Sequence, residues 1–212
     1  MIKIKWFGHS MWKVSSPKCT IIIDPFTDIG FPMVGNLIAD VVIASHDHYD
    51  HNNFKLIEGN PQKITQVGTY HIKDAIIKMI HSSHGQLDGK SLGDNCMSLI
   101  MIDGLSLLHC GDLGEFPDEN TLSQIEDTDV LFVPVGGKYT LDAPKAKKFI
   151  ELIKPKIIFP MHYRMEGTKV DIESINTFEK LFPNIEVLDT DTFEISKTSL
   201  PMIQRILKIY YE

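Results

Sequence analysis

Apolar and polar positions alternate or cluster in short runs through the first half of the chain, and this pattern predicts β-strands. Residues 2–8 alternate with period two, whereas residues 19–26 and 40–45 form continuous apolar runs. Alternation is typical of a half-buried strand, and a short apolar run bounded by turn residues is typical of a buried strand. Further strands are predicted at residues 62–68, 75–81, 96–103 and 105–112. The last two form a predicted hairpin, because Asp-Gly is a strong turn signal.

The second half of the chain alternates strands with amphipathic helices. Helices are predicted at residues 118–127, 142–154 and 171–182, and strands at residues 130–137, 155–163 and 184–189. The second helix has an Asp cap and a proline in its first turn. Strands followed by β–α–β units predict mixed sheets covered by helices.

No long linker, low-complexity tract or repeat interrupts this pattern, so residues 1–212 are predicted to form a single domain. Residues 198–212 form an apolar C-terminal tail that fits either a last strand or a helix. Such a tail packs on its own core or forms a partner surface, and the sequence leaves both open.

Composition narrows the classes of function. A net charge of −7 and a pI of about 5.7 argue against nucleic acid as a partner, because domains that bind phosphate backbones carry a basic face. The three cysteines show no paired spacing, the start lacks a secretory apolar region, and no apolar run approaches the roughly 20 residues of a membrane span. We therefore expect a cytoplasmic protein without membrane contact. A homo-oligomer is compatible with the sequence.

The most unusual stretch is residues 44–53, ASHDHYDHNN, which holds three histidines and two aspartates within six positions after an apolar run. In an extended backbone His46 and His48 point to one side and can bind one cation. The turn that follows directs Asp50 and His51 toward a second cation. A solvated polar loop is the simpler alternative, but this density of ligand-type side chains favours a metal site.

Three apolar runs downstream also end in a candidate ligand. His84 follows one run, Asp112 ends the next, and His162 ends the run IIFPMH. Sites in sheet proteins form where strands end and loops converge. Seven candidates in all fit two cations: three histidines for one, an aspartate with two histidines for the other, and a bridging carboxylate.

Four segments, SHDHYDHNN, HCGDLG, VPVGGKYTLDAPKA and PKIIFPMHY, resemble the metallo-β-lactamase superfamily. Within it they are most similar to the compact Zn-dependent hydrolases near the L-ascorbate 6-phosphate lactonase-like proteins. The resemblance runs from about Ile4 to Asp189. It implies an α/β fold, a four-layer αββα sandwich of two mixed sheets flanked by helices, with a dinuclear site at one edge.

The resemblance also implies a role for each candidate ligand. The first cation is expected on His46, His48 and His84, and the second on Asp50, His51 and His162, with Asp112 bridging the two. One position is ambiguous, because HSSH offers His81 or His84 as the third ligand of the first cation. The spacing to Asp112 and the glycine-rich loop after it favour His84.

The sequence also suggests roles for residues around these ligands. His9 and Ser10 in FGHS match family positions beside the site, and Asp24 either accepts a hydrogen bond from a ligand histidine or caps a turn before Pro25. We interpret His109 as a packed strand residue. Cys110 is expected to be a small buried apolar residue rather than a metal-reactive thiol.

These features predict a metal-dependent hydrolase of a small-molecule substrate with an ester-like bond: a lactone, phosphodiester or thioester. Two divalent cations, with zinc favoured over manganese or iron, would share a water that supplies the attacking hydroxide. Asp50 and Asp112 are the predicted catalytic carboxylates, and Asp50 would orient the nucleophile or pass a proton to the leaving group. The alternatives are a non-catalytic metal-binding or ligand-sensing protein of the same fold and, less favoured, an RNA-processing nuclease.

Overall fold

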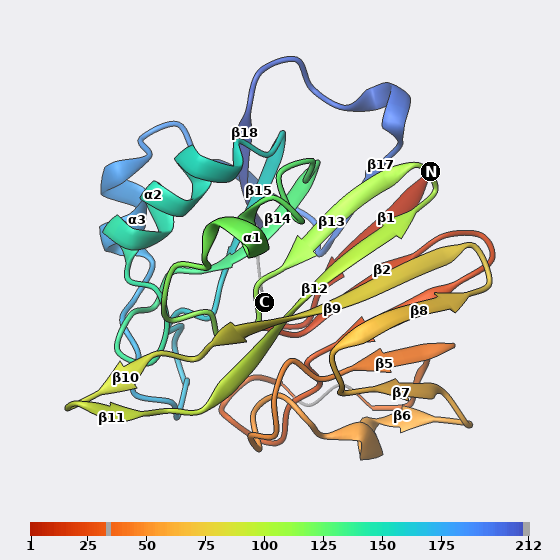
Figure 1. Ribbon diagram of the computed structural model, residues 1–212, viewed down its shortest axis with the longest axis horizontal. Helices are drawn as coiled ribbons and strands as arrows, with labels where there is room; N and C mark the ends of the chain where they lie inside the picture. Colours follow the sequence, from red (N-terminus) through yellow and green to blue (C-terminus); the bar gives the residue numbers. More distant parts are fainter. Residues whose placement is uncertain (33–34, 210–212) are drawn as a thin grey trace.

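Two β-sheets pack face to face in the computed structural model, which describes residues 1–32 and 35–209 (Figure 1). The first sheet has six strands in the order β17-β1-β2-β3-β5-β7. These strands are β1 (Ile2–Trp6), β2 (Trp12–Ser15), β3 (Thr20–Ile23), β5 (Val41–Ile43), β7 (Gln62–Ile64) and β17 (Thr192–Ile195). The sheet is mixed, because β1, β2, β3 and β17 pair antiparallel while β3, β5 and β7 pair parallel.

The second sheet has eight strands in the order β16-β18-β15-β14-β13-β12-β9-β8. They are β8 (Gly68–Ile72), β9 (Ala75–Ser83), β12 (Asp94–Ile102), β13 (Leu105–His109), β14 (Val130–Pro134), β15 (Ile157–Met161), β16 (Glu186–Leu188) and β18 (Arg205–Ile209). The predicted hairpin is confirmed: β12 and β13 pair antiparallel, and Asp103 and Gly104 both have positive φ, as a two-residue hairpin turn requires.

Short paired strands lie outside the two sheets. They are β4 (Leu37–Ile38) with β6 (Ile57–Glu58), and β10 (Gln86–Leu87) with β11 (Lys90–Ser91). The β10–β11 hairpin projects from the body of the molecule (Figure 1). It replaces the irregular loop that the glycines after His84 predicted.

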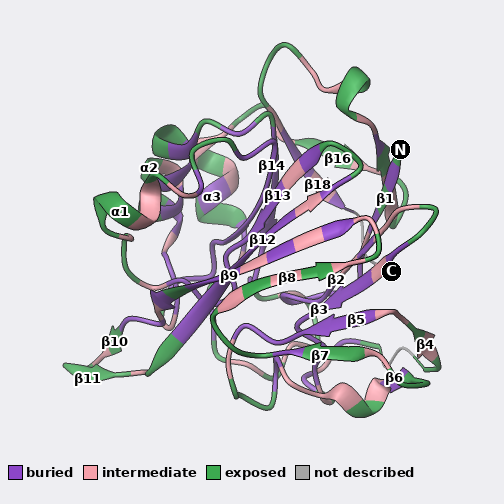
Figure 2. Ribbon diagram, turned by 45° about the vertical axis from the view of Figure 1, so that its right-hand side comes forward, coloured by how far each residue is buried: buried purple, intermediate pink, exposed green. Residues whose placement is uncertain are grey.

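Aromatic side chains fill the space between the sheets. Trp12 on β2 lies 4.6 Å from Phe132 on β14 and 5.2 Å from Phe159 on β15, measured between ring centroids, and it stacks on Trp6. Figure 2 shows the central strands as mostly buried and the outer sides of the helices as exposed. This core holds the two sheets at a fixed spacing, so the loops at their ends are also fixed relative to each other.

Helices cover the eight-stranded sheet. They are α1 (Glu119–Leu122), α2 (Ala143–Ile153) and α3 (Asn176–Leu181). Helix α2 begins where predicted, because the Asp142 side chain accepts a hydrogen bond from Lys145 N at 2.8 Å. Helices α1 and α3 are shorter than predicted.

The outer face of the six-stranded sheet carries less regular structure. The segment NNFKLIEGN, in which the sequence predicts a short helix that stops at Gly59-Asn60-Pro61, forms only a single 3-10 turn, η1 (Phe54–Leu56). An apolar cluster that includes Phe7, Phe26 and Phe31 packs there with residues of β3 and β5. The helical layer expected on this side is therefore largely replaced by loops.

The apolar tail joins the molecule's own sheet. Strand β18 pairs parallel with β15 and β16, and Leu207 is fully buried. A short 3-10 turn, η2 (Lys197–Ser199), precedes it. The tail is thus a strand that packs on the core, and residues 210–212 of the predicted tail lie outside the described residues.

Strand direction explains where a site can form. In the first sheet β1, β3 and β5 run the same way, and in the second sheet β9, β13 and β15 do. The loops after these strands therefore emerge at a common edge of each sheet. Every residue that the sequence marked as a ligand follows one of them.

Candidate metal centre

All seven predicted ligands gather at this edge of the sandwich. The loop after β5 supplies four of them, and the loops after β9, β13 and β15 supply one each. Their ligand atoms form overlapping groups in which all donors lie within 4.8 Å of one another. The groups are His46, His48 and His84; His46, His51 and Asp112; and His9, Asp50, His51 and His162. We call His46, His48 and His84 the outer set and Asp50, His51 and His162 the inner set.

Asp112 lies between the two sets. Its Oδ2 is 3.4 Å from His84 Nε2 in the outer set and 3.2 Å from His162 Nε2 in the inner set. Its Oδ1 is 3.3 Å from His51 Nε2. One carboxylate therefore faces histidines of both sets, which is the arrangement that a bridging ligand needs.

His84 and His81 occupy different environments. His84 is buried in the outer set, 4.9 Å from the His46 ring. His81 is exposed on β9, and its Nε2 lies 3.0 Å from Asp94, an exposed carboxylate. Because β9 continues to Ser83, the period of two places His81 on an outward face, away from the cluster.

A buried carboxylate orients one histidine of each set. Asp24 Oδ2 accepts a hydrogen bond from His51 Nδ1 at 2.9 Å, so the His51 Nε2 atom faces the site. The same oxygen accepts from Ser45 Oγ at 2.8 Å, and Ser45 Oγ lies 2.9 Å from His46 Nδ1. Since Ser45 has one hydroxyl proton and gives it to Asp24, its oxygen accepts from His46. The sequence left two roles open for Asp24, and the structure shows the one in which it accepts a hydrogen bond from a ligand histidine.

Two further groups hold the ligands in place, and sequence analysis did not single out either of them as an orienting group. The Tyr139 carbonyl lies 3.0 Å from His84 Nδ1 and so fixes the Nε2 atom of His84 toward the cluster. Asn95 Oδ1 accepts from the backbone N–H of Asp112 at 2.9 Å, while Asn95 Nδ2 donates to the Cys110 carbonyl. Neither a lone asparagine in a strand nor a backbone carbonyl has a signal in a single sequence.

Two glycines permit close backbone approach behind the ligands. A Cβ atom at Gly114 would lie 2.1 Å from the His84 carbonyl oxygen, and one at Gly136 would lie 2.1 Å from the His162 carbonyl oxygen. His162 itself has a positive φ of 53°. The ligand loops are thus tightly packed and, at His162, conformationally strained, as functional sites often are.

Electrostatics at the site match a bound cation. Burial lowers the pKa of His46 to about 3, so its imidazole is neutral at pH 7. Burial opposes ionisation of Asp112, but His162 and His51 hold the pKa of Asp112 well below its usual value. His46 Nε2, His51 Nε2 and Asp112 Oδ1 are buried and make no hydrogen bond to any residue that the structure describes. The neutral imidazole of His46, the carboxylate of Asp112 and these buried atoms without a hydrogen bond fit a divalent metal.

His109 and Cys110 lie close to the site, but the ring nitrogens of His109 have partners within the protein and the Cys110 side chain is buried. The two ring nitrogens of His109 contact the Ser10 carbonyl at 2.9 Å and the Gly111 backbone N–H at 3.1 Å. Cys110 is fully buried, and burial raises the pKa of its thiol. Both therefore occupy the packed positions that the sequence predicted.

A pocket of about 390 Å³ opens onto the centre. Its polar floor includes His48, Asp50, His84, Asp112 and His162, and its walls include Tyr49, Leu92, Tyr139, Val170 and Lys169. This volume is in the range of small-molecule sites.

Comparison with known proteins decides the family. A sequence profile for the beta-lactamase superfamily domain matches residues 3–162. A UPF0173 metal-dependent hydrolase of Carboxydothermus hydrogenoformans is 31% identical, with 76% of this chain and 84% of the relative covered. The chain belongs to the beta-lactamase superfamily, among the UPF0173 metal-dependent hydrolases. A relative from Saccharolobus solfataricus with the same name is 28% identical over 87% of this chain and 93% of its own length.

Solved structures agree with this family. A Thermotoga maritima protein, assigned as a Zn-dependent hydrolase of the metallo-beta-lactamase superfamily, has a TM-score of 0.81 and 29% identity, with 99% of each chain covered. The isothiocyanate hydrolase from Delia radicum gut bacteria shares the fold, with a TM-score of 0.70 at 14% identity over 92% of this chain and 99% of that one. The expected metallo-β-lactamase fold and the expected metal-dependent hydrolase are therefore confirmed. Within residues 1–32 and 35–209, no helix has the length and apolar character that crossing a membrane requires.

Proposed function

We propose that this protein uses two divalent cations to hydrolyse a small ester-like substrate: a lactone, a phosphodiester or a thioester. The outer set would hold one cation and the inner set the other, with Asp112 between them. Zinc is the metal that these nitrogen and oxygen donors favour, and manganese and iron also accept them.

The position of Asp112 carries the proposal. Its carboxylate lies within 3.4 Å of His51, His84 and His162, which are histidines of both sets. A site for one cation would need only one of these sets. Six donors in two adjoining sets, joined by one carboxylate, support a dinuclear centre.

Two divalent cations held by these residues would supply a hydroxide nucleophile near neutral pH. Asp50 supports this chemistry as an ionised group. Burial alone would raise the pKa of Asp50, but His9 and His51 hold it well below its usual value. At neutral pH Asp50 is therefore a carboxylate, suited to bind a cation or accept a proton rather than to begin as the acid.

The pocket above the centre supports a small substrate. Its walls combine the aromatic rings of Tyr49 and Tyr139 with apolar Leu92 and Val170. The lysine on the wall, Lys169, is paired with Asp28 at 2.6 Å. The pocket thus lacks the run of unpaired cations that a nucleic-acid backbone needs, which agrees with the overall net charge of −7.

The decisive experiment is hydrolysis by zinc-reconstituted protein across matched panels of lactones, phosphodiesters and thioesters. The Asp112→Ala variant serves beside the wild type, and a metal-free sample serves as the blank. We expect turnover in one panel, lost on chelation, restored by zinc and absent from Asp112→Ala. Activity that survives both chelation and Asp112→Ala would overturn the proposal, as would zinc binding at one equivalent or less.

A further inference from the structure

His9 is a buried histidine that lies beside Asp50 and is not one of the seven predicted ligands. It lies between β1 and β2 with a positive φ of 49°, and its side chain is fully buried. Neither of its ring nitrogens makes a hydrogen bond to any of the residues described in the structure. A buried imidazole in this state is costly unless something else binds it, because its nitrogens lose their water and gain no hydrogen bond in return.

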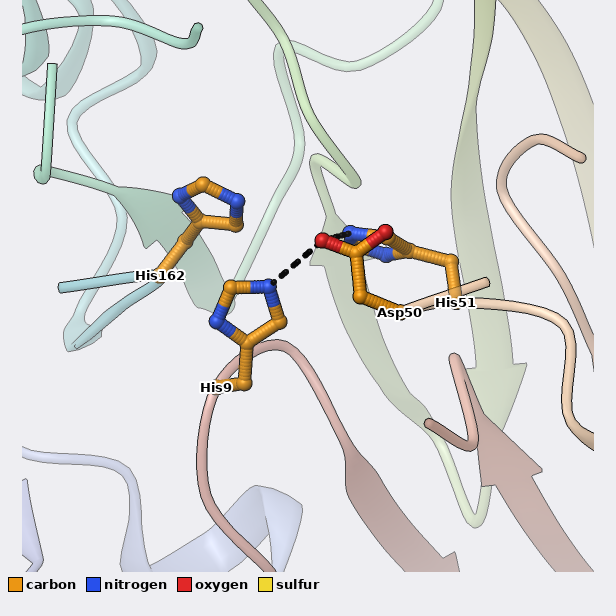
Figure 3. A group of neighbouring side chains, drawn as sticks. All are labelled: His9, Asp50, His51 and His162. Atoms are coloured by element: carbon orange, nitrogen blue, oxygen red, sulfur yellow. Dashed lines mark ion pairs between the residues drawn. The ribbon is translucent and has the colours of Figure 1, made fainter. Parts of the chain in front are cut away.

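The ring of His9 faces the inner set. Its Nε2 lies 3.5 Å from Asp50 Oδ2, and its centroid lies 4.2 Å from that of His162 and 5.3 Å from that of His51. Figure 3 shows Asp50 between His9 and His51, with His162 beside them. One donor atom from each of the four residues lies within 4.8 Å of the others.

These spacings fit donors that share a cation. Two ligands at about 2.1 Å from one cation, separated by about 90–110°, are roughly 3.0–3.4 Å apart. The 3.5 Å between His9 Nε2 and Asp50 Oδ2 is close to this range, and it is longer than a normal hydrogen bond.

The two sets also differ in burial. All four residues of the inner group, with His9 included, are buried. In the outer set only His84 is buried, while His46 is intermediate and His48 exposed. A cation that binds more protein ligands has fewer positions left for water or substrate.

We propose that His9 is a further protein ligand of the inner cation, beside Asp50, His51, His162 and the bridging Asp112, so that the inner cation has one more protein ligand than the outer cation. The inference rests on the proposed dinuclear function and assigns different tasks to its two cations. The inner cation would be held tightly and would exchange slowly. The outer cation, bound by three histidines and Asp112, would exchange more readily with solution and meet the substrate.

Direct detection of the metal–nitrogen bond tests this assignment without any activity assay. Protein labelled with nitrogen-15 histidine is loaded with cadmium-113, and one-bond couplings between the two nuclei identify the bound imidazoles. We expect a coupled resonance for His9 that disappears in His9→Phe, a change that keeps the ring and removes both nitrogens. Couplings at His51 and His162 with none at His9 would overturn the inference.

A zinc titration against a chromophoric chelator gives a second, independent reading. In the wild type we expect two zinc-binding constants, the tighter for the inner site and the weaker for the outer site. In His9→Phe the affinity of the inner site should fall by about a hundredfold, while that of the outer site stays unchanged. His109→Phe is the matched control, because His109 is equally buried but its nitrogens are satisfied within the protein. It should keep both constants. Two unchanged constants in His9→Phe would contradict the inference alone, whereas a wild type that binds a single zinc would contradict the proposed function.

Discussion

Asp24 and His51 share a fully buried hydrogen bond of 2.9 Å, although 27 positions separate them in the sequence. Through Ser45 the same Asp24 oxygen also fixes His46. Asp24 therefore orients one ligand of the inner set and one of the outer set. Burial opposes its ionisation, but His51 and the other neighbouring histidines hold the pKa of Asp24 below its usual value, so it stays an acceptor at neutral pH.

Asp24→Asn should weaken both cation sites together. In either orientation the new amide would point its N–H donors at groups that are themselves donors: the Ser45 backbone N–H at the Oδ1 position, or Ser45 Oγ and His51 Nδ1 at the Oδ2 position. The support behind both ligand histidines would be weakened. We expect zinc affinity to fall by about 10–100-fold and the free energy of unfolding by about 1–3 kcal/mol. Competitive zinc titration and chemical denaturation measure the two effects.

Asp129→Asn is the matched control for this change. Asp129 is also a buried carboxylate that accepts hydrogen bonds, from Ser106 N and Lys197 Nζ, but it lies before β14 at the opposite edge of the sheet. It should lower stability and leave zinc affinity unchanged. Equal zinc affinity in Asp24→Asn and the wild type would show that Asp24 is only a folding residue.

Asn95→Ala should weaken the support of Asp112, the proposed bridging ligand. Asn95 holds the backbone of Asp112 and also donates to the Cys110 carbonyl and Ser82 Oγ, all in buried surroundings. Its loss leaves several polar groups unpaired, each at a cost of about 1–3 kcal/mol. We expect a Tm lowered by several degrees and weaker zinc binding, measured by calorimetry with and without zinc. Asn184→Ala, at an exposed turn, should change neither quantity.

His84→Ala and His81→Ala should give opposite results. His84 lies in the outer set, so its loss should reduce bound zinc from two equivalents toward one and abolish turnover. His81 is exposed and pairs only with exposed Asp94, so its loss should leave zinc content intact and change stability by less than about 0.5 kcal/mol. Metal analysis after gel filtration distinguishes the two. Loss of zinc in His81→Ala would reverse the assignment.

Much of this arrangement follows from the sequence because it depends on local patterns. The apolar run at residues 40–45 is followed by His46, and the run at residues 105–112 ends in Asp112. Strand direction then brings the ends of such runs to one edge of the sandwich. Contacts between distant segments have no such signal. The sequence placed His9 beside the site and left the role of Asp24 open, and it did not show that Ser45 links Asp24 to His46. The helical layer expected near Phe54 is also largely absent from the described residues, because aromatic side chains from loops cover that face of the six-stranded sheet.

Removal of the metal should destabilise the fold. A ligand that binds only the folded state stabilises it by about 2.7 kcal/mol at 100 times its Kd. Protein dialysed against a chelator should therefore unfold at a Tm several degrees lower than protein with excess zinc, as measured by calorimetry. Asp112→Ala should lose most of this zinc-dependent difference. A wild-type Tm that does not respond to zinc would contradict a metal centre in the folded protein.

The three cysteines should be unreactive in the folded protein. Burial raises the pKa of the Cys19 thiol to about 11 and also raises those of Cys96 and Cys110. A higher pKa means less thiolate at any given pH, and for Cys19 a rise of two units from the usual 9.0 means about a hundredfold less at pH 8. A disulfide reagent that absorbs on reaction should label the native protein slowly at pH 8, and three thiols quickly in guanidinium chloride. Rapid labelling of Cys110 itself under native conditions, located by peptide mass spectrometry, would show that the core behind Asp112 is open.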